Sequence, residues 1–200
     1  MSKRCFDIIL SGGIILLLSP FLLLIGLLVK LGDFGPVFYC QERVGLHGRL
    51  FLIRKFRTMY VGADKDGPCV TKSADRRVTR LGVYLRKWKM DELPQLFNVF
   101  CGEMSLVGPR PEVARYVKMY TPDQRRVLGV RPGITDLASI EFRNEEDMLS
   151  KAADLEQFYI NNCMPRKLEL NMRYASDASI FSDCIIILKT VFAIFFRCRR

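Results

Sequence analysis

The N-terminal part of the chain contains a long run of uncharged, mainly apolar residues. The run covers residues 8–29, which is 22 residues, and is flanked by the basic Lys3, Arg4 and Lys30. A straight helix of this length would reach about 33 Å, enough to cross the hydrocarbon core of a bilayer. A secretory signal peptide fits poorly, because the run is too long and no small-residue cleavage site follows it. The sequence therefore predicts a membrane-associated helical segment.

A Ser19-Pro20 pair interrupts this run. Proline removes a backbone hydrogen bond and clashes with the preceding turn, so a helix here must bend or break, and a neighbouring serine can bind a freed carbonyl. The outcome is either a kinked transmembrane helix or a re-entrant helix-break-helix over residues 1–30. Basic residues at both ends and the basic segment that follows favour the re-entrant hairpin, since the positive-inside rule keeps both ends cytoplasmic.

Charged residues, like apolar residues, are distributed unevenly along the chain. The 200-residue chain has 31 Lys and Arg against 21 Asp and Glu, a net charge of +10, yet 50% of its residues are hydrophobic. This hydrophobic content excludes a disordered basic tail. Residues 41–90 hold most of the excess, with 13 basic and 4 acidic residues. Such a segment can bind nucleic acid, anionic lipid or a phosphorylated small molecule, or it can be a solvated face.

The remaining residues, 31–200, show neither a repeat nor a low-complexity linker, so we expect one domain. Their patterns predict a mostly helical α+β fold with a small β-hairpin and amphipathic interfacial helices. The expected elements are hairpin strands at 37–41 and 50–56 around a turn at 45–48, a polar loop at 64–75, an amphipathic helix at 77–90, a helix at 94–100 ended by Gly102, and helical structure at 147–163.

A second apolar stretch lies near the C-terminus. Residues 184–196 are too few to span a bilayer, are interrupted by Lys189, and are followed by Arg197, Arg199 and Arg200. An interfacial helix over about residues 184–200 fits this pattern, and a terminal helix packed into the core is the alternative. The seven cysteines form no Cys-x-x-Cys pair and the chain has one histidine, His47, so neither a disulfide framework nor a zinc site is expected.

The acidic pair Asp91-Glu92 precedes Pro94, a residue favoured at a first helical position. Capping of the following helix is the simplest role for these carboxylates. Nearby basic residues and a helix N-terminus would also keep Asp91 ionised, so that it could bind a divalent metal or attack phosphorus. Arg110 and Arg131 lie in Pro-Arg-Pro and Arg-Pro-Gly turns, and such rigid arginines suit bidentate contacts to phosphate.

These motifs, taken together and in order, resemble those of the bacterial sugar transferases. They are QERVG at 41–45, KFRTM at 55–59, DELPQLFNV at 91–99, MSLVGPRP at 104–111 and RPGIT at 131–135. The family comprises the monotopic phosphoglycosyl transferases that begin glycan assembly on polyprenol phosphate. The resemblance runs from the Ser19-Pro20 pair to about residue 145 and implies a catalytic core with a re-entrant N-terminal helix broken at that pair, attached to the cytoplasmic face of the bacterial inner membrane.

The resemblance also implies roles for individual residues. Asp91 would attack the β-phosphate of a UDP-sugar, release UMP and form a phosphosugar-aspartate, from which polyprenol (undecaprenyl) phosphate takes the sugar phosphate. Glu92 would be the second catalytic residue of the pair, and Mg²⁺ would bind near Asp91. The implied phosphate- and nucleotide-binding residues are Arg110, Arg131, Lys55, Arg57 and Arg86. The product would be the first lipid-linked intermediate of polysaccharide or glycoprotein biosynthesis.

One segment departs from the family pattern. Where many relatives carry Gly-Leu, Gln and Gly-Arg-Asn after the RPGIT motif, residues 136–147 read DLASIEFRNEED. We therefore expect this segment to border the sugar pocket. The sugar, the exact polyprenol and the oligomeric state stay open, with a homodimer among the candidates.

Two other functions are compatible with the residues. One is a non-catalytic, membrane-anchored basic module that holds anionic lipid or nucleic acid through residues 41–90. Nucleic acid is not an expected partner, since this segment lacks a recognised helix-turn-helix or an aromatic stacking platform. The other is a metal-dependent phosphatase that uses Asp91 and releases free sugar phosphate.

Overall fold

Helices dominate the architecture. The computed structural model describes residues 2–63, 75–152 and 154–197, and the expected loop at 64–75 lies, apart from Asp75, outside them. The α-helices are α1 (Lys3–Asp33), α2 (Arg80–Lys87), α3 (Gln95–Cys101), α4 (Ala114–Val117), α5 (Leu137–Glu141), α6 (Glu145–Ser150), α7 (Leu155–Phe158), α8 (Met164–Ser176) and α9 (Ile180–Arg197). The strands are β1 (Phe38–Val44), β2 (Leu50–Phe56), β3 (Ser105–Val107) and β4 (Gly133–Thr135). Short helical turns are η1 (Leu46–Gly48), η2 (Met90–Glu92), η3 (Gln124–Gly129) and η4 (Tyr159–Cys163). The predicted mostly helical α+β class is confirmed.

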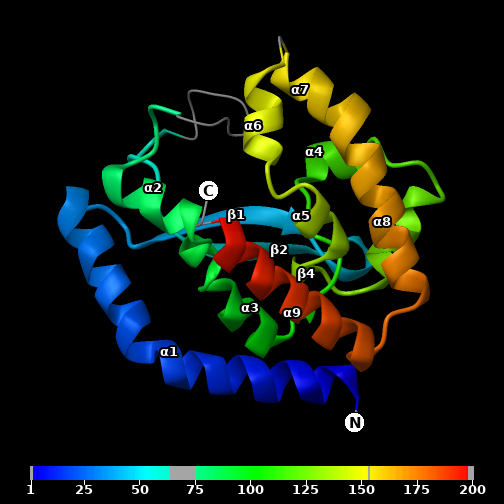
Figure 1. Ribbon diagram of the computed structural model, residues 1–200, viewed down its shortest axis with the longest axis horizontal. Coiled ribbons are helices and arrows are strands. Elements are labelled where there is room, and N and C mark those ends of the chain that lie inside the picture. The colour runs from blue at the N-terminus through cyan, green and yellow to red at the C-terminus, as the bar shows by residue number, and fades with distance from the viewer. Residues whose placement is uncertain (1, 64–74, 153, 198–200) are drawn as a thin grey trace.

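Helix α1 is continuous through Pro20, so the predicted break is a bend. Figure 1 shows the helix changing direction near its middle. In a regular helix the N–H of residue 20 would bind the carbonyl of Leu16, and proline has no such donor. The Ser19 hydroxyl donates to that carbonyl instead, at 2.8 Å. The serine therefore replaces the missing hydrogen bond, and the helix continues past the proline.

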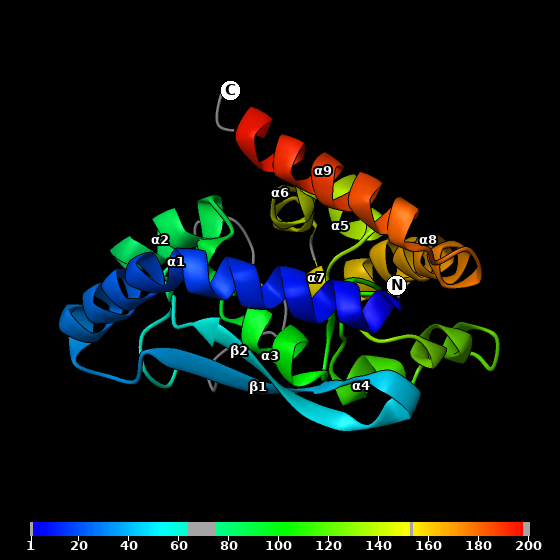
Figure 2. The ribbon, with the colours of Figure 1, turned by 90° about the horizontal axis from the view of Figure 1, so that it is seen from below.

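Both halves of α1 pack against the rest of the protein (Figure 2). The N-terminal half adds Phe6, Leu10 and Ile14 to a core cluster that contains Val99 of α3, and the C-terminal half buries Ile25 against another cluster. The midsection differs, because the side chains of the adjacent Leu16 and Leu17 are 78% and 79% exposed. The helix is long and apolar enough to cross a membrane, but only 22% of its most apolar window is buried, so it is not an ordinary core helix.

The predicted hairpin is confirmed. Strands β1 and β2 pair antiparallel, with Phe38 opposite Phe56 and Val44 opposite Leu50. Asn98 of α3 fixes the helix to this hairpin, since its side chain donates to the carbonyl of Leu52 at 2.8 Å and accepts from the N–H of Arg54 at 3.1 Å. This fully buried asparagine, within the 91–99 motif, is thus structural. Helix α3 ends as expected at Gly102, whose φ is 92°.

Two short parallel strands bring the Pro-Arg-Pro and Arg-Pro-Gly turns together. β3 pairs with β4, and beyond the strands the N–H of Gly108 binds the carbonyl of Thr135 at 3.0 Å. The backbones of Gly108 and Gly133 are so close that a Cβ on Gly133 would lie 2.1 Å from the nitrogen of Gly108. No side chain fits at this crossing, so glycine at both positions lets the two turns lie side by side.

The last third of the described chain forms more separate helices than the sequence predicted. Helical structure over 147–163 is interrupted between α6 and α7, where the Asp154 side chain accepts from the N–H groups of Glu156 and Gln157 and starts a new helix. From there η4 leads directly into α8. The C-terminal apolar stretch forms α9, which buries Ile186 and leaves Leu188 69% exposed. One face of the helix therefore joins the core, as the alternative expectation had it, and the interfacial position of the other face stays a prediction.

Candidate active site

Asp91 lies in the short turn η2, between α2 and α3. The preceding Lys89 adopts a left-handed conformation with φ of 56°, which turns the chain sharply after α2. Asp91 is only 7% exposed, and its Oδ1 atom has no hydrogen-bond partner among the residues that the structure describes. Helix α3 begins at Gln95 without any side-chain cap, so the expected capping role of the acidic pair is wrong. Asp91 is instead a buried carboxylate with a free acceptor atom.

Glu92 is held by two cations. Lys55 of β2 donates to its Oε1 at 2.9 Å, and Arg110 of the Pro-Arg-Pro turn binds both of its oxygens, one of them at 3.1 Å. Burial raises the pKa of Glu92, but the charges of Arg110 and Lys55 and the hydrogen bond from Arg110 outweigh burial and hold the pKa well below its usual value. Glu92 is therefore ionised, and both of its oxygens are engaged.

The electrostatics of Asp91 are different. Burial is the largest influence and raises its pKa, and the charge of Glu92 raises it further, whereas Lys55, Lys89 and Arg86 lower it. The sequence-based expectation counted the cations but not the burial, and burial exceeds their effect. The two adjacent carboxylates thus differ in character, one being paired and strongly acidic and the other unpaired and less acidic.

Asp91 and Glu92 line a cavity of about 570 Å³. Three of the predicted phosphate-binding residues, Lys55, Arg86 and Arg110, line it as well, together with Lys89. Arg86 is oriented by a hydrogen bond from its Nε to the Thr58 hydroxyl at 2.9 Å. The cavity therefore combines one free carboxylate oxygen with several cations, an arrangement that suits a phosphorylated ligand beside a nucleophile.

The other two predicted phosphate-binding residues lie outside the lining of this cavity. Arg57 is 7% exposed and forms an ion pair with Asp33 at the end of α1. Arg131 donates from Nε to the carbonyl of Gly102 at 3.1 Å. In this structure, then, Arg57 anchors α1 and Arg131 contacts the end of α3.

Two residues of this site were missed by the sequence reasoning. Lys89 was counted only among the basic residues near Asp91, and its left-handed backbone has no sequence signal. Asp136 is fully buried, and its carboxylate accepts from the backbone N–H of Arg110 at 3.2 Å and from that of Ser139 at 2.6 Å. It thereby connects the Pro-Arg-Pro turn to the start of α5. Asp136 is an N-cap by position, a signal that could have been read.

The segment that departs from the family pattern contributes to the wall of the same cavity. Its lining residues include Ser139 and Phe142, with Arg143 and Glu145 beyond α5. The segment therefore borders the Asp91 cavity, and its contact with the sugar stays a prediction.

The donor atoms of the site fit a magnesium ion held by one protein carboxylate. Mg²⁺ prefers oxygen ligands and often binds through one or two carboxylates plus substrate phosphates. The unpartnered Oδ1 of Asp91 is a suitable oxygen, whereas the oxygens of Glu92 are engaged by cations. Within the described residues, no group of three or more His, Cys, Asp and Glu side chains converges on a common point. Asp91 is thus the candidate ligand, with the rest supplied by substrate and water.

Comparison with known proteins gives consistent matches. The chain is 39% identical over 194 residues to a UDP-glucose:undecaprenyl-phosphate glucose-1-phosphate transferase of Klebsiella pneumoniae, covering 95% of this chain and 39% of that protein. It is 36% identical over 209 residues to the exopolysaccharide production protein ExoY of Rhizobium meliloti, covering 97% and 85%. It is 37% identical over 194 residues to a UDP-N-acetylgalactosamine-undecaprenyl-phosphate N-acetylgalactosaminephosphotransferase of Aeromonas hydrophila, covering 94% and 42%.

These relatives differ in length and in the sugar that their names specify. The chain spans about two fifths of the Klebsiella and Aeromonas proteins but most of ExoY. A family-level match covers residues 1–197, and therefore includes α1, the Asp91 cavity and α9. On these matches, together with the ordered motifs that build the cavity, the chain belongs to the bacterial sugar transferase family.

Proposed function

We propose that this protein transfers a sugar-1-phosphate from a UDP-sugar to undecaprenyl phosphate, releases UMP, and so performs the first membrane step of glycan biosynthesis. The observation that carries the proposal is the pair of unlike carboxylates. Glu92 is saturated by Lys55 and Arg110, whereas the adjacent Asp91 keeps a buried oxygen free in a cavity lined by cations. That is the arrangement expected of a nucleophile beside a diphosphate site.

Asp91 acts first as nucleophile and then as leaving group. A carboxylate oxygen forms a bond to the β-phosphorus of the UDP-sugar, and the bond from that phosphorus to the bridging oxygen breaks. The electron pair departs on that oxygen with UMP, and Asp91 is left as a mixed anhydride with the sugar phosphate. A phosphate oxygen of the lipid then attacks the same phosphorus, which restores the Asp91 carboxylate and gives undecaprenyl-diphosphate-sugar.

The cations bind and orient the phosphates in both displacements. Arg110 has a fork of donors and uses it on Glu92, which fixes the guanidinium at the cavity wall. Lys55 is a point charge whose pKa is lowered by burial and by Arg110, against the opposing effect of Glu92. Glu92 therefore positions Lys55 and Arg110. Magnesium bound at Asp91 would offset the negative charge of the diphosphate.

We also propose that α1 is re-entrant and that the protein is monotopic, on the cytoplasmic face of the inner membrane. The support is that both ends of α1 bind the same body. Near the N-terminal end Arg4 donates to the carbonyl of Val99 at 2.6 Å, and at the other end Asp33 pairs with Arg57. A spanning helix would place its two ends on opposite sides of the bilayer, whereas here the exposed leucines of the bend are free to enter one leaflet.

The nucleophile is tested with Asp91→Asn in detergent or in vesicles. An amide cannot form the anhydride, so we expect UMP release from a UDP-sugar and lipid product both to fall by at least about a hundredfold, the scale of a lost catalytic group. With wild-type protein and no lipid acceptor, the mass of the intact protein should increase by one phosphosugar, located at Asp91.

The matched control is Asp123→Asn. Asp123 pairs with Arg126 at the surface, and its side chain is 79% exposed, so this variant should keep wild-type turnover. A lipid product formed at the wild-type rate by Asp91→Asn would refute the nucleophile. Release of free sugar phosphate without any lipid acceptor would point to a phosphatase instead, and ligand binding that weakens with salt without any turnover would point to a non-catalytic module.

A further inference from the structure

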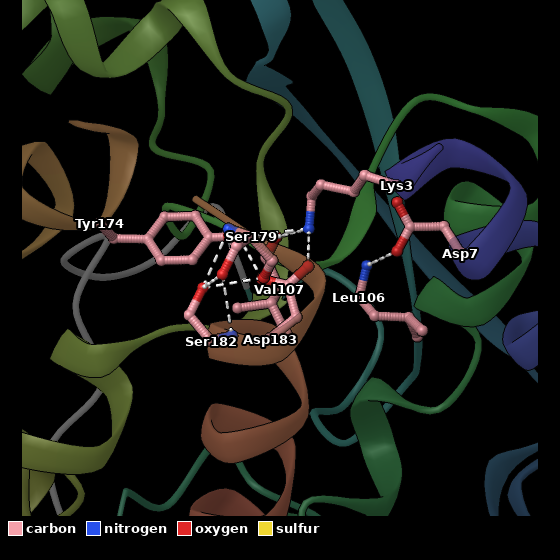
Figure 3. Close-up of polar contacts among 8 residues, drawn as sticks. All are labelled: Lys3, Asp7, Leu106, Val107, Tyr174, Ser179, Ser182 and Asp183. Carbon is pink, nitrogen blue, oxygen red and sulfur yellow. Dashed lines mark hydrogen bonds and ion pairs between the residues drawn. The ribbon is translucent and has the colours of Figure 1, made fainter. Parts of the chain in front are cut away.

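Helices α1 and α9 form a V. Their first turns are close together, and the two helices diverge from there, as both overall views show (Figures 1 and 2). The vertex is held by a buried polar cluster that Figure 3 shows in detail. In it, Lys3 of α1 forms an ion pair with Asp183 of α9, and Tyr174 of α8 donates to Asp183 at 2.6 Å.

The vertex is also fixed to the body. Lys3 donates to the carbonyl of Val107 at 3.1 Å, and Tyr174 donates to the same carbonyl at 3.1 Å. One turn further along α1, the carboxylate of Asp7 accepts from the N–H of Leu106 at 3.1 Å (Figure 3). Helix α1 therefore binds strand β3 directly, and α9 is connected to the strand through the hydrogen bond between Asp183 and Tyr174.

The space between the arms of the V is part of the Asp91 cavity. Leu10 and Ile14 of α1 line it from one side, and Ile187, Val191, Ala193 and Ile194 of α9 line it from the other. Its floor includes Leu96 of α3 and Leu106 of β3. The residues of α1 and α9 that line the cavity are apolar except Thr190, whereas Lys55, Asp91 and Arg110 bring charged groups to it, so the same cavity has apolar and charged walls.

The apolar end leads outward to apolar surface. Leu17 on α1 is 79% exposed, and on α9 Leu188 and Phe192 are 69% and 62% exposed. An exposed apolar surface of this kind on two neighbouring helices suits contact with lipid. A molecule that moves from the membrane to Asp91 between the arms of the V would thus meet apolar walls first and cations last.

We propose that the V between α1 and α9 is the groove that receives the prenyl chain of the lipid acceptor, and that it guides the lipid phosphate to Asp91. The inference rests on the proposed function. Charge complementarity selects the occupant: an isoprenoid phosphate is apolar along its chain and anionic at one end, matching the cavity from its mouth to its cations. The nucleotide-sugar is polar throughout, and no part of it suits the apolar arms of the V.

The experiment separates the two halves of the reaction. The donor half is measured without lipid, as exchange of labelled UMP into the UDP-sugar, and the acceptor half as lipid product formed. In Ala193→Trp an indole projects from α9 into the groove. We expect kcat/KM for undecaprenyl phosphate to fall by about tenfold or more, the scale of one misplaced group in an apolar pocket, and exchange to stay at the wild-type rate.

Phe181→Trp is the matched control, because Phe181 lies on the same helix, is 77% exposed and is outside the cavity lining. It should leave both halves unchanged. Val191→Trp blocks the same wall from a position already 45% exposed, and so tests the groove even if Ala193→Trp fails to fold. When the acceptor is a prenyl phosphate with one isoprene unit, kcat/KM for the acceptor should differ much less between Ala193→Trp and wild type.

Three results would overturn the groove. One is a rate of lipid product formation that stays unchanged in both Ala193→Trp and Val191→Trp. Another is an exchange rate that falls together with the acceptor half, since the V would then serve the donor. The third is an equal defect with short-chain and long-chain acceptors. The proposed function fails separately, namely if wild-type protein shows neither exchange nor lipid product.

Discussion

At the scale of single residues, the site depends on giving two neighbouring carboxylates different surroundings. Glu92 receives bonds from Lys55 and Arg110, whereas no hydrogen-bond partner reaches Oδ1 of Asp91. Leaving a buried acceptor unpaired costs about 1–3 kcal/mol, so the free oxygen lowers stability. Because no described residue bonds this oxygen, the Asp91 carboxylate is open to groups that the substrate brings.

This arrangement predicts a ligand-dependent stability effect in Glu92→Gln. Removing the carboxylate leaves Lys55 and Arg110 without their anion, so the free energy of unfolding should fall by about 1–3 kcal/mol. Inorganic pyrophosphate can supply the negative charge that these two cations have lost. We therefore expect pyrophosphate to raise Tm more in Glu92→Gln than in wild type, as measured by thermal unfolding.

The pH dependence of this contribution follows from the same contacts. Because the pKa of Glu92 is lowered in the folded state, its stabilising effect is present above its ordinary pKa and is lost only as the pH falls through the lowered value. Glu169→Gln is the control, since Glu169 pairs with Arg166 and its side chain is 53% exposed. If pyrophosphate raised Tm equally in wild type, Glu92→Gln and Glu169→Gln, the prediction would be contradicted.

At the scale of elements, sequence patterns correctly predicted those helices, strands and turns that depend on interactions between neighbouring residues. The hairpin followed from β-prone runs around a glycine-containing turn, and the end of α3 followed from Gly102. Pro20 predicted a bend or a break, and the helix bends without breaking because the hydroxyl of Ser19 supplies the missing hydrogen bond to Leu16. The sequence shows a serine beside the proline, but it does not show how completely the serine hydroxyl replaces the missing hydrogen bond.

Contacts between distant residues could not be predicted in this way. Lys55, Asp91 and Arg110 were named from motifs, yet nothing in their spacing shows that Glu92, rather than Asp91, takes both cations. Arg57 sits in a basic motif and instead pairs with Asp33, because the path of α1 brings that aspartate beside it. Burial, which decides the direction of the pKa of Asp91, exists only after the chain has folded.

Replacing Lys3 or Asp183 at the vertex of the V should lower stability by unequal amounts. The Asp183 carboxylate is 1% exposed, whereas the Lys3 side chain is 33% exposed and can be hydrated on its own. Lys3→Met leaves a buried carboxylate with Tyr174 as its remaining partner, so it should cost about 3 kcal/mol or more. Asp183→Asn keeps a polar partner and should cost less. Chemical unfolding in mild detergent measures both.

The double variant Lys3→Met/Asp183→Leu provides the cross-check. It removes the buried charge together with its partner, so it should be more stable than Lys3→Met alone. With Asp183→Leu measured singly as well, a double variant that loses the sum of the Lys3→Met and Asp183→Leu losses would show that the two residues contribute independently, and the vertex would then not be an ion pair in energetic terms.

At the scale of the whole molecule, the main question is how the protein sits in the bilayer. Both ends of α1 contact one body, and the exposed leucines of its midsection lie between them. With a re-entrant α1, the Asp91 cavity lies near the headgroups, where a lipid phosphate and a soluble nucleotide-sugar can both reach it.

Two natural cysteines test this topology. Cys5 and Cys40 are exposed free thiols that lie near the start of α1 and beyond its end. In variants that keep one of them plus the buried Cys163, a membrane-impermeant maleimide should label either thiol in inverted inner-membrane vesicles and neither in spheroplasts. Labelling of one thiol from each side would mean that α1 spans the membrane.

The position of Lys3 and Asp183 in the chain has a consequence for biosynthesis. The two partners are separated by 180 residues, and synthesis at about 5–20 residues per second puts roughly 9–36 s between them. The apolar helix leaves the ribosome long before the residues that clamp its first turn exist. The first turn of α1 can therefore be clamped only after Asp183 has been made, and the prenyl groove can form only then.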